Sequence, residues 1–173
     1  MKRLRRLLRE GAYFRFCKML LGSATGTGAD LTEESGAMRF RCRGDSMRPF
    51  IPPGSVLRVR EAEAEEVLAG DVLCYVEQQA PVAHRVIGIR ETESGLIYDT
   101  RGDASDIIKE IPSTAAVYII EEVEHPLFRY RTDSALGRMI AQSAVAGGLR
   151  WFAVRRFVAI VQKHILRVTH TAE

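Results

Sequence analysis

Hydrophobic and polar positions alternate in residues 38–43 of this chain. Met38, Phe40 and Cys42 alternate there with arginines, and a period of two is typical of a half-buried β-strand. The same reasoning predicts further strands at residues 55–60, 72–76, 82–90, 96–100 and 116–123. The run at 72–76 is apolar throughout, which predicts burial on both faces. Short strands separated by turn residues indicate a mainly β fold, a compact barrel or sandwich.

Both ends of the chain have helical spacing instead. Residues 1–22 mix leucines with arginines, which predicts a basic amphipathic helix, and the Gly-, Ser- and Thr-rich residues 22–36 predict a flexible linker. From Ser134 to Val168 apolar residues recur at helical spacing, and Gly147-Gly148 predicts a division into two helices. We therefore expect a helix and linker over 1–36, a β domain over 37–124 and a helical extension over 125–173.

Charge is distributed unevenly along the chain. The formal net charge of +3 combines +6 over residues 1–23, −8 over 24–134 and +5 over 135–173. Basic amphipathic ends favour peripheral contact with anionic lipid headgroups. The alternative is that these helices pack on the β domain with their arginines in water. We expect no nucleic-acid partner, because basic and aromatic residues are not interleaved as base stacking requires.

Three further patterns concern compartment and cofactors. The sequence contains no window of 18 apolar residues, so we expect no transmembrane helix. Arg15 and Lys18 interrupt the only apolar stretch that could serve as a cleavable signal peptide, so we expect none. Three cysteines without C-x-x-C spacing predict no disulfide framework and favour a reducing compartment. The four histidines lack metal-ligand spacing, so we expect no metal or other cofactor. The expected location is the cytoplasm or a membrane surface.

A serine stands in a tight turn between the first two predicted strands. Gly44 permits a sharp bend before Ser46, and Pro49 prevents a helix from continuing after it. A nucleophilic hydroxyl needs such exposure, together with a nearby backbone N–H for the oxyanion. Serines in turns also commonly bond their own backbone, so the turn alone does not distinguish the two roles.

Two later stretches carry further candidate chemistry. The predicted strand at 82–90 contains His84, and the pKa of histidine suits a general base near neutrality. Residues 100–106 form a predicted turn with two carboxylates, Asp103 and Asp106. A single strand histidine and a Gly-Asp turn each also have an ordinary structural interpretation.

Four motifs along the chain resemble those of a known family, and they occur in the same order as in that family. They are Gly44–Pro49, Gly70–Val72, His84–Val86 and Gly102-Asp103. Together they resemble the type I signal peptidases and the related LexA-like serine proteases, and within these the serine–histidine branch of endoplasmic-reticulum and archaeal signal peptidases. The resemblance extends over about residues 38–123. It implies a signal-peptidase-like β barrel or sandwich.

The resemblance implies a role for each motif residue. Ser46 would be the nucleophile, with its own N–H in the oxyanion hole, and His84 the general base. Asp103 or Asp106 would orient the imidazole. The family's second acidic position lies some six residues beyond the Gly-Asp pair, whereas Asp106 follows Asp103 by three, so the choice between the two carboxylates stays open.

Residues next to the serine complete the expected site. The resemblance implies that Met47 and Pro49 shape the turn and the wall that binds substrate. Asp45 departs from the family pattern, because a charge beside the nucleophile disfavours an oxyanion. Asp45 is tolerable there only if it turns to solvent or pairs with Arg43 or Arg48.

These patterns favour a serine endopeptidase that cleaves a signal or leader-like peptide through Ser46 and His84. One alternative is a non-catalytic module that keeps the peptidase fold and only binds a peptide. A LexA-like autoprotease is disfavoured, because the 45 residues before Ser46 contain no Ala-Gly pair and the base position holds histidine rather than lysine.

Overall fold

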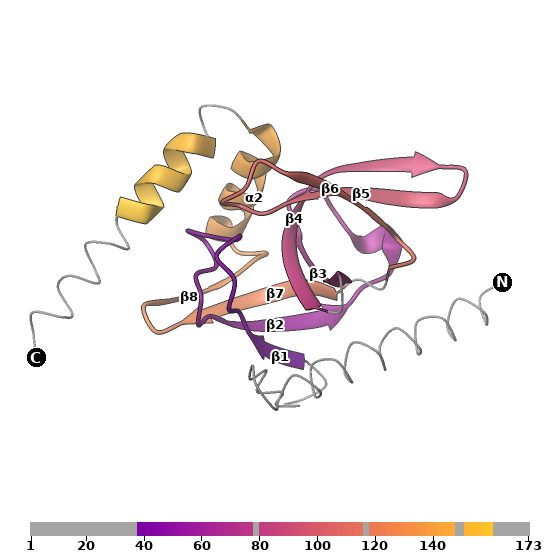
Figure 1. Ribbon diagram of the computed structural model, residues 1–173. Coiled ribbons are helices and arrows are strands. Elements are labelled where there is room, and N and C mark those ends of the chain that lie inside the picture. Colours follow the sequence, from indigo (N-terminus) through magenta and orange to yellow (C-terminus); the bar gives the residue numbers. More distant parts are fainter. Residues whose placement is uncertain (1–37, 78–79, 116–117, 148–150, 161–173) are drawn as a thin grey trace, which may run out of the picture.

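The computed structural model describes residues 38–77, 80–115, 118–147 and 151–160 (Figure 1). Within these residues the fold is mainly β, as predicted. The strands are β1 (Met38–Arg41), β2 (Val56–Glu61), β3 (Val72–Glu77), β4 (Ala80–Thr92), β5 (Gly95–Arg101), β6 (Ile108–Pro112), β7 (Tyr118–His125) and β8 (Phe128–Arg131). The helices are a 3₁₀ turn η2 (Ala64–Glu66), α2 (Ala135–Ala146) and residues 151–160. The helix and linker expected over 1–36 lie outside the described residues.

The strands form one antiparallel sheet in the order β1-β2-β7-β3-β4-β5-β6, with β8 paired to β7. This path is open, so the barrel form of the expected barrel or sandwich is not confirmed. A β-bulge between Val86 and Gly88 interrupts the pairing of β4 with β5. Bulges bend a strand and increase its twist, and beyond this one the β4–β5 hairpin projects from the rest of the sheet (Figure 1). The bend separates a packed half of β4, which carries His84, from a more exposed half.

Two short strands were not predicted. β6 ends at Pro112 and lies at one end of the sheet, which is where proline is tolerated in a sheet. β8 alternates Phe128 and Tyr130 with two arginines over only four residues, which is too short for the alternation to be distinguished from a loop. β8 falls within the range 125–173, before the helices begin.

The core lies on both faces of the sheet, and β3 contributes to both. Val72 and Cys74 face one cluster, and Leu73 and Tyr75 face the other. All four side chains are buried, which confirms the predicted burial on both faces for residues 72–75. The first cluster also contains Met47 from the serine turn.

The two helices pack beside the serine turn. Ser134 caps α2 by accepting a hydrogen bond from the Gly137 N–H, and α2 ends at Gly147, which has φ 61°. The predicted helix break at Gly147 is therefore confirmed. Trp151 stacks on Phe50 with ring centroids 5.2 Å apart, so the helix 151–160 is tied to the loop between β1 and β2. No helix among the described residues is long and apolar enough to cross a membrane.

Candidate active site

The loop between β1 and β2 carries Ser46 in a turn. Two backbone hydrogen bonds of 2.7 Å between Cys42 and the segment Gly54-Ser55 close the loop at its base. Met47 and Ile51 are buried in the core. Removing these two apolar side chains from water stabilises the folded loop. Ser46 itself is half-buried. The indigo loop in Figure 1 rises from β1 towards the loop that follows β5.

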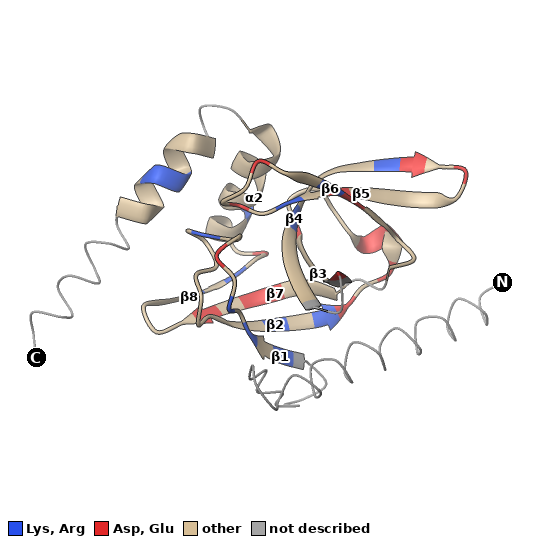
Figure 2. Ribbon diagram, viewed as in Figure 1, with Lys and Arg blue, Asp and Glu red and all other residues tan. Residues whose placement is uncertain are grey.

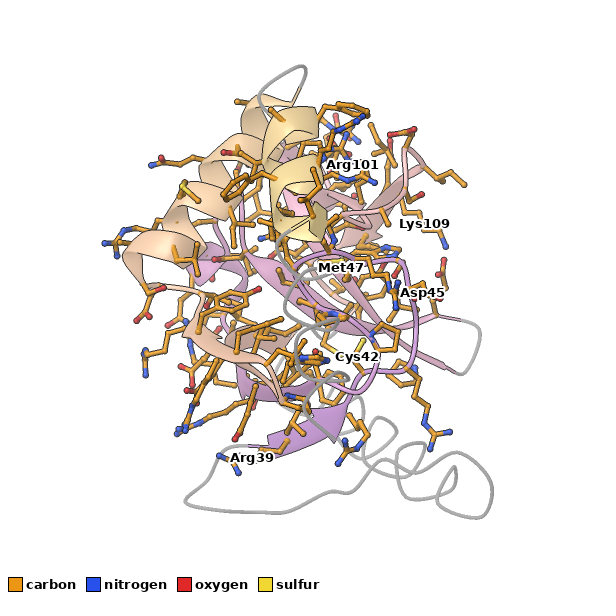
Figure 3. The ribbon with its side chains drawn as sticks, turned by 90° about the vertical axis from the view of Figure 1, so that its left-hand side faces the viewer. Arg39, Cys42, Asp45, Met47, Arg101 and Lys109 are labelled. Atoms are coloured by element: carbon orange, nitrogen blue, oxygen red, sulfur yellow. The ribbon has the colours of Figure 1, made fainter. Side chains whose placement is uncertain are left out.

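The neighbours of Ser46 divide between core and solvent. Met47 is only 1% exposed and Pro49 is buried, so both residues anchor the turn in the interior of the protein. Asp45 is exposed and its Oδ1 lies 2.8 Å from Nε of Arg48. This pairing meets the condition set by the sequence, that the charge beside the serine is directed to solvent. Figure 3 looks onto this end of the molecule, with Asp45, Met47 and Lys109 labelled.

Gly102 packs directly against Ser46. The Ala104 N–H donates to the Ser46 carbonyl oxygen at 2.7 Å. A Cβ added at Gly102 would lie 2.7 Å from that oxygen and 3.1 Å from the Ser46 Cβ, closer than ordinary van der Waals contact. A glycine is therefore required at position 102, and the structure brings the first and the last of the four motifs together.

His84 approaches the same glycine from β4. The β4–β5 register pairs Arg85 with Arg101, so the next pair in this register would be His84 and Gly102. This register places His84 in line with Gly102, against which Ser46 packs. Ser46 and His84 form no hydrogen bond with each other among the described residues, and in unliganded enzymes the hydrogen bonds of the catalytic groups are often long.

The His84 ring is buried and held by a hydroxyl. The Tyr75 Oη lies 3.1 Å from His84 Nδ1, and His84 is 8% exposed. Burial lowers the pKa of His84 below the ordinary 6.5, and the positive charge of Lys109 lowers it further, against the opposing effects of Glu77 and Asp103. The imidazole is therefore neutral near pH 7, the state that a general base requires.

Asp103 is engaged by an arginine rather than by His84. Its two carboxylate oxygens accept from Nε and Nη2 of Arg85 at 2.8 and 2.7 Å, and Arg85 Nη1 donates to the Gly70 carbonyl at 2.9 Å. Both charged side chains are almost completely buried. This bidentate pair joins the second, third and fourth motifs. Asp106 is exposed.

The position six residues beyond Asp103, where the resemblance implied a second carboxylate, holds Lys109. Lys109 lies on β6, and its Nζ forms an ion pair with Glu77 at 2.6 Å. A cation therefore stands near His84 where the resemblance implied an anion. This departure accounts in part for the direction of the pKa shift of His84.

Sequence reasoning missed Arg85 and Tyr75 as parts of the site. Arg85 could have been found, because a cation in a predicted strand needs an anionic partner wherever that strand is buried, and Asp103 is in the adjacent motif. Tyr75 carried no such signal, since it stands in an apolar strand where aromatic residues are common.

No family model, curated protein or solved structure matches this chain. The site is therefore interpreted from its own geometry and from the motifs that form it.

Proposed function

We propose that this chain is a serine endopeptidase that cleaves signal or leader-like peptides. The observation that carries the proposal is the sheet register, which places a buried histidine of lowered pKa in line with Gly102, the residue on which the half-buried Ser46 packs. A base near a nucleophilic hydroxyl is the minimum that acyl transfer by serine requires. The four motifs resemble those of the serine–histidine signal peptidases in their order, and the proposed substrate class comes from this resemblance. For the same reason we propose a signal-peptidase-like barrel or sandwich as the fold.

The chemistry follows from these two groups. Ser46 Oγ attacks the scissile carbonyl carbon while its proton passes to His84 Nε2, and the Ser46 N–H stabilises the oxyanion that forms. The C–N bond then breaks, and His84 Nε2 donates the proton to the leaving amine. Water hydrolyses the resulting Ser46 ester by the same proton path in reverse, which restores both residues.

The proposal is tested by incubating leader-type peptides, and the full chain itself, with the wild type and with Ser46→Ala in the presence of anionic vesicles. Mass spectrometry would detect the products. Cleavage by the wild type alone supports the proposal and identifies the preferred site. Absence of cleavage with intact peptide binding would favour the alternative, a non-catalytic module that binds peptides.

The activity should depend on pH through His84. Because the pKa of His84 is lowered by burial and by Lys109, the base stays neutral at lower pH than an ordinary histidine. Cleavage is therefore expected to fall as His84 becomes protonated, with a midpoint at more acidic pH than an ordinary histidine would give. Lys109→Gln removes a cation beside Glu77 and should move this midpoint to higher pH.

The control for this shift is Arg90→Gln. Arg90 lies on β4 like His84, but it pairs with Asp99 and Glu110 on the exposed half of the hairpin. Its replacement should leave the midpoint where it is. An unchanged midpoint in Lys109→Gln, measured from rates against pH, would contradict the role given to His84.

We also propose that the helix 151–160 contacts an anionic membrane surface. One face packs Trp151, Val154 and Val158 into the molecule, while Phe152 and Phe157 on the other sides are 61% and 68% exposed. A helix that is apolar nearly all round is normally covered on all sides. Figure 2 shows basic residues as a blue band within this helix, and arginines beside exposed aromatics suit anionic lipid headgroups.

The vesicle test uses the double variant Phe152→Ser, Phe157→Ser. Burying one phenylalanine contributes about 1.5–3 kcal/mol, so loss of both should lower binding to phosphatidylglycerol-containing vesicles at least about tenfold. The control is Leu136→Ser, which changes a half-exposed apolar residue on α2. Equal binding of the double variant and the wild type in a sedimentation assay would contradict membrane contact by this face.

A further inference from the structure

A line of buried hydroxyl groups leads away from His84. Tyr75 Oη lies 3.1 Å from His84 Nδ1 and 3.5 Å from Thr100 Oγ1. Thr100 Oγ1 in turn donates to the backbone carbonyl oxygen of Lys109 at 3.2 Å. Tyr75 is 1% and Thr100 0% exposed, so neither hydroxyl has access to bulk water. The line crosses from β3 through β5 to β6.

The sheet register brings these groups together. Tyr75 pairs with Val82, and Leu73 pairs with His84, so Tyr75 and His84 are diagonal neighbours on one face, within reach of aromatic side chains. Their rings meet edge to face at 73°. Thr100 pairs with Val86 on one side and with Lys109 on the other.

The end of the line decides its direction. A carbonyl oxygen can only accept, so the single proton of Thr100 is committed to Lys109. The Thr100 oxygen must then accept from Tyr75, whose own single proton is used in that bond. Burial raises the pKa of Tyr75, so its hydroxyl stays protonated. The oxygen of Tyr75 is left to accept from His84, which requires the proton of the neutral imidazole to be on Nδ1.

We propose that Tyr75, supported by Thr100, is the positioning residue that holds His84 in the Nδ1–H tautomer, in place of a carboxylate. This inference rests on the proposed function for its catalytic consequence, because the Nδ1–H tautomer leaves the Nε2 lone pair to take the proton of Ser46. Both oxygens of Asp103 are already bound by Arg85. The hydroxyl line therefore does what an acidic third residue does in other serine enzymes: it sets the tautomer and the ring orientation.

The direct test is long-range ¹H–¹⁵N NMR of the full chain labelled with ¹⁵N-histidine, above the pKa of His84. His84→Gln assigns the signal. The expected wild-type spectrum has Nδ1 protonated and Nε2 unprotonated. Tyr75→Phe should move the signal towards the Nε2–H form. A wild-type spectrum with the proton on Nε2, or an unchanged tautomer in Tyr75→Phe, would overturn the inference.

Thr100 supplies a second variant that keeps Tyr75 in place. In Thr100→Val the Tyr75 hydroxyl loses its acceptor and becomes free to donate to Nδ1, so the tautomer should change although the tyrosine remains. Thr100→Ser keeps the hydroxyl and should restore the wild-type spectrum. The matched control is Tyr98→Phe, which removes a buried hydroxyl that donates to the Ala64 carbonyl instead. A tautomer that changes equally in Tyr98→Phe would mean a general loss of structure and would overturn the inference.

The catalytic consequence is measured with a fluorophosphonate probe, which reacts with activated serines. Tyr75→Phe and Thr100→Val should slow labelling of Ser46 about 10- to 100-fold, with Thr100→Ser and Tyr98→Phe close to wild type. A wild-type protein with the expected tautomer but no labelling would refute the proposed function and leave the hydroxyl line standing. Normal labelling of both hydroxyl-deleting variants would refute the positioning role and leave the proposed function standing.

Discussion

Replacing Ser46 by alanine is expected to lower the rate of peptide cleavage by roughly three orders of magnitude or more, because the variant lacks the hydroxyl that forms the acyl intermediate. His84→Ala should have a comparable effect, since Ser46 would lose the group that takes its proton. The two losses should not add in the double variant, because the residues act as one unit. Single-turnover cleavage followed by mass spectrometry measures all three.

The control for these variants is Ser94→Ala in the turn between β4 and β5. Ser94 is exposed and its hydroxyl bonds to Thr92 nearby in sequence, so its loss should leave the rate unchanged. Circular dichroism checks that each variant keeps a native sheet, and Ser46→Ala should keep it because Ser46 is only half-buried and is not among the residues of the hydrophobic core. A folded Ser46→Ala variant with a cleavage rate within about tenfold of the wild-type rate would contradict the proposed serine mechanism.

The second large effect concerns stability. Asp103→Ala leaves the buried guanidinium of Arg85 without its counter-charge, and breaking a buried pair in this way costs about 3–5 kcal/mol. That is a large part of the 5–15 kcal/mol that typically stabilises a domain. We expect the midpoint of urea unfolding to fall accordingly. The double variant Arg85→Met, Asp103→Leu should recover part of the loss, because it leaves no buried charge unpaired.

A matched pair on the same two strands provides the control. Arg90 on β4 binds Asp99 on β5 through two hydrogen bonds of 3.0 and 2.8 Å, as Arg85 binds Asp103, but Arg90 is 48% exposed. Asp99→Ala should therefore cost less than about 1 kcal/mol. Equal losses of stability from Asp99→Ala and Asp103→Ala would show that burial does not increase the contribution of the Arg85–Asp103 pair to stability.

Asp103→Ala also separates two roles for this carboxylate. If Asp103 mainly holds Arg85 and the Gly70 carbonyl in place, activity should fall in proportion to the folded fraction. If it orients His84, activity should collapse under conditions where the protein is fully folded. Asp106 is exposed, so Asp106→Ala is expected to leave both stability and rate close to wild type.

Much of the fold could be read from local patterns. The strands at β1 to β5 and β7, the double burial of β3 and the helix break at Gly147 follow from residues close in sequence. These features depend on side-chain periodicity and turn chemistry, which neighbouring residues express directly. β6 and β8 were too short, or too near an edge, for their periodicity to be distinguished from a loop.

The sequence by itself determined the candidate chemistry: a serine in a turn, a strand histidine and a Gly-Asp turn in a family-like order. Only the tertiary structure decided which side chains meet. Asp103 bonds Arg85 across 18 residues, and Tyr75 reaches His84 across 9 and Thr100 across 25. Such partners depend on strand register, and a shift of one residue would turn each side chain to the opposite face. Register is a property of the whole sheet, which is why no local pattern could identify the partner of His84.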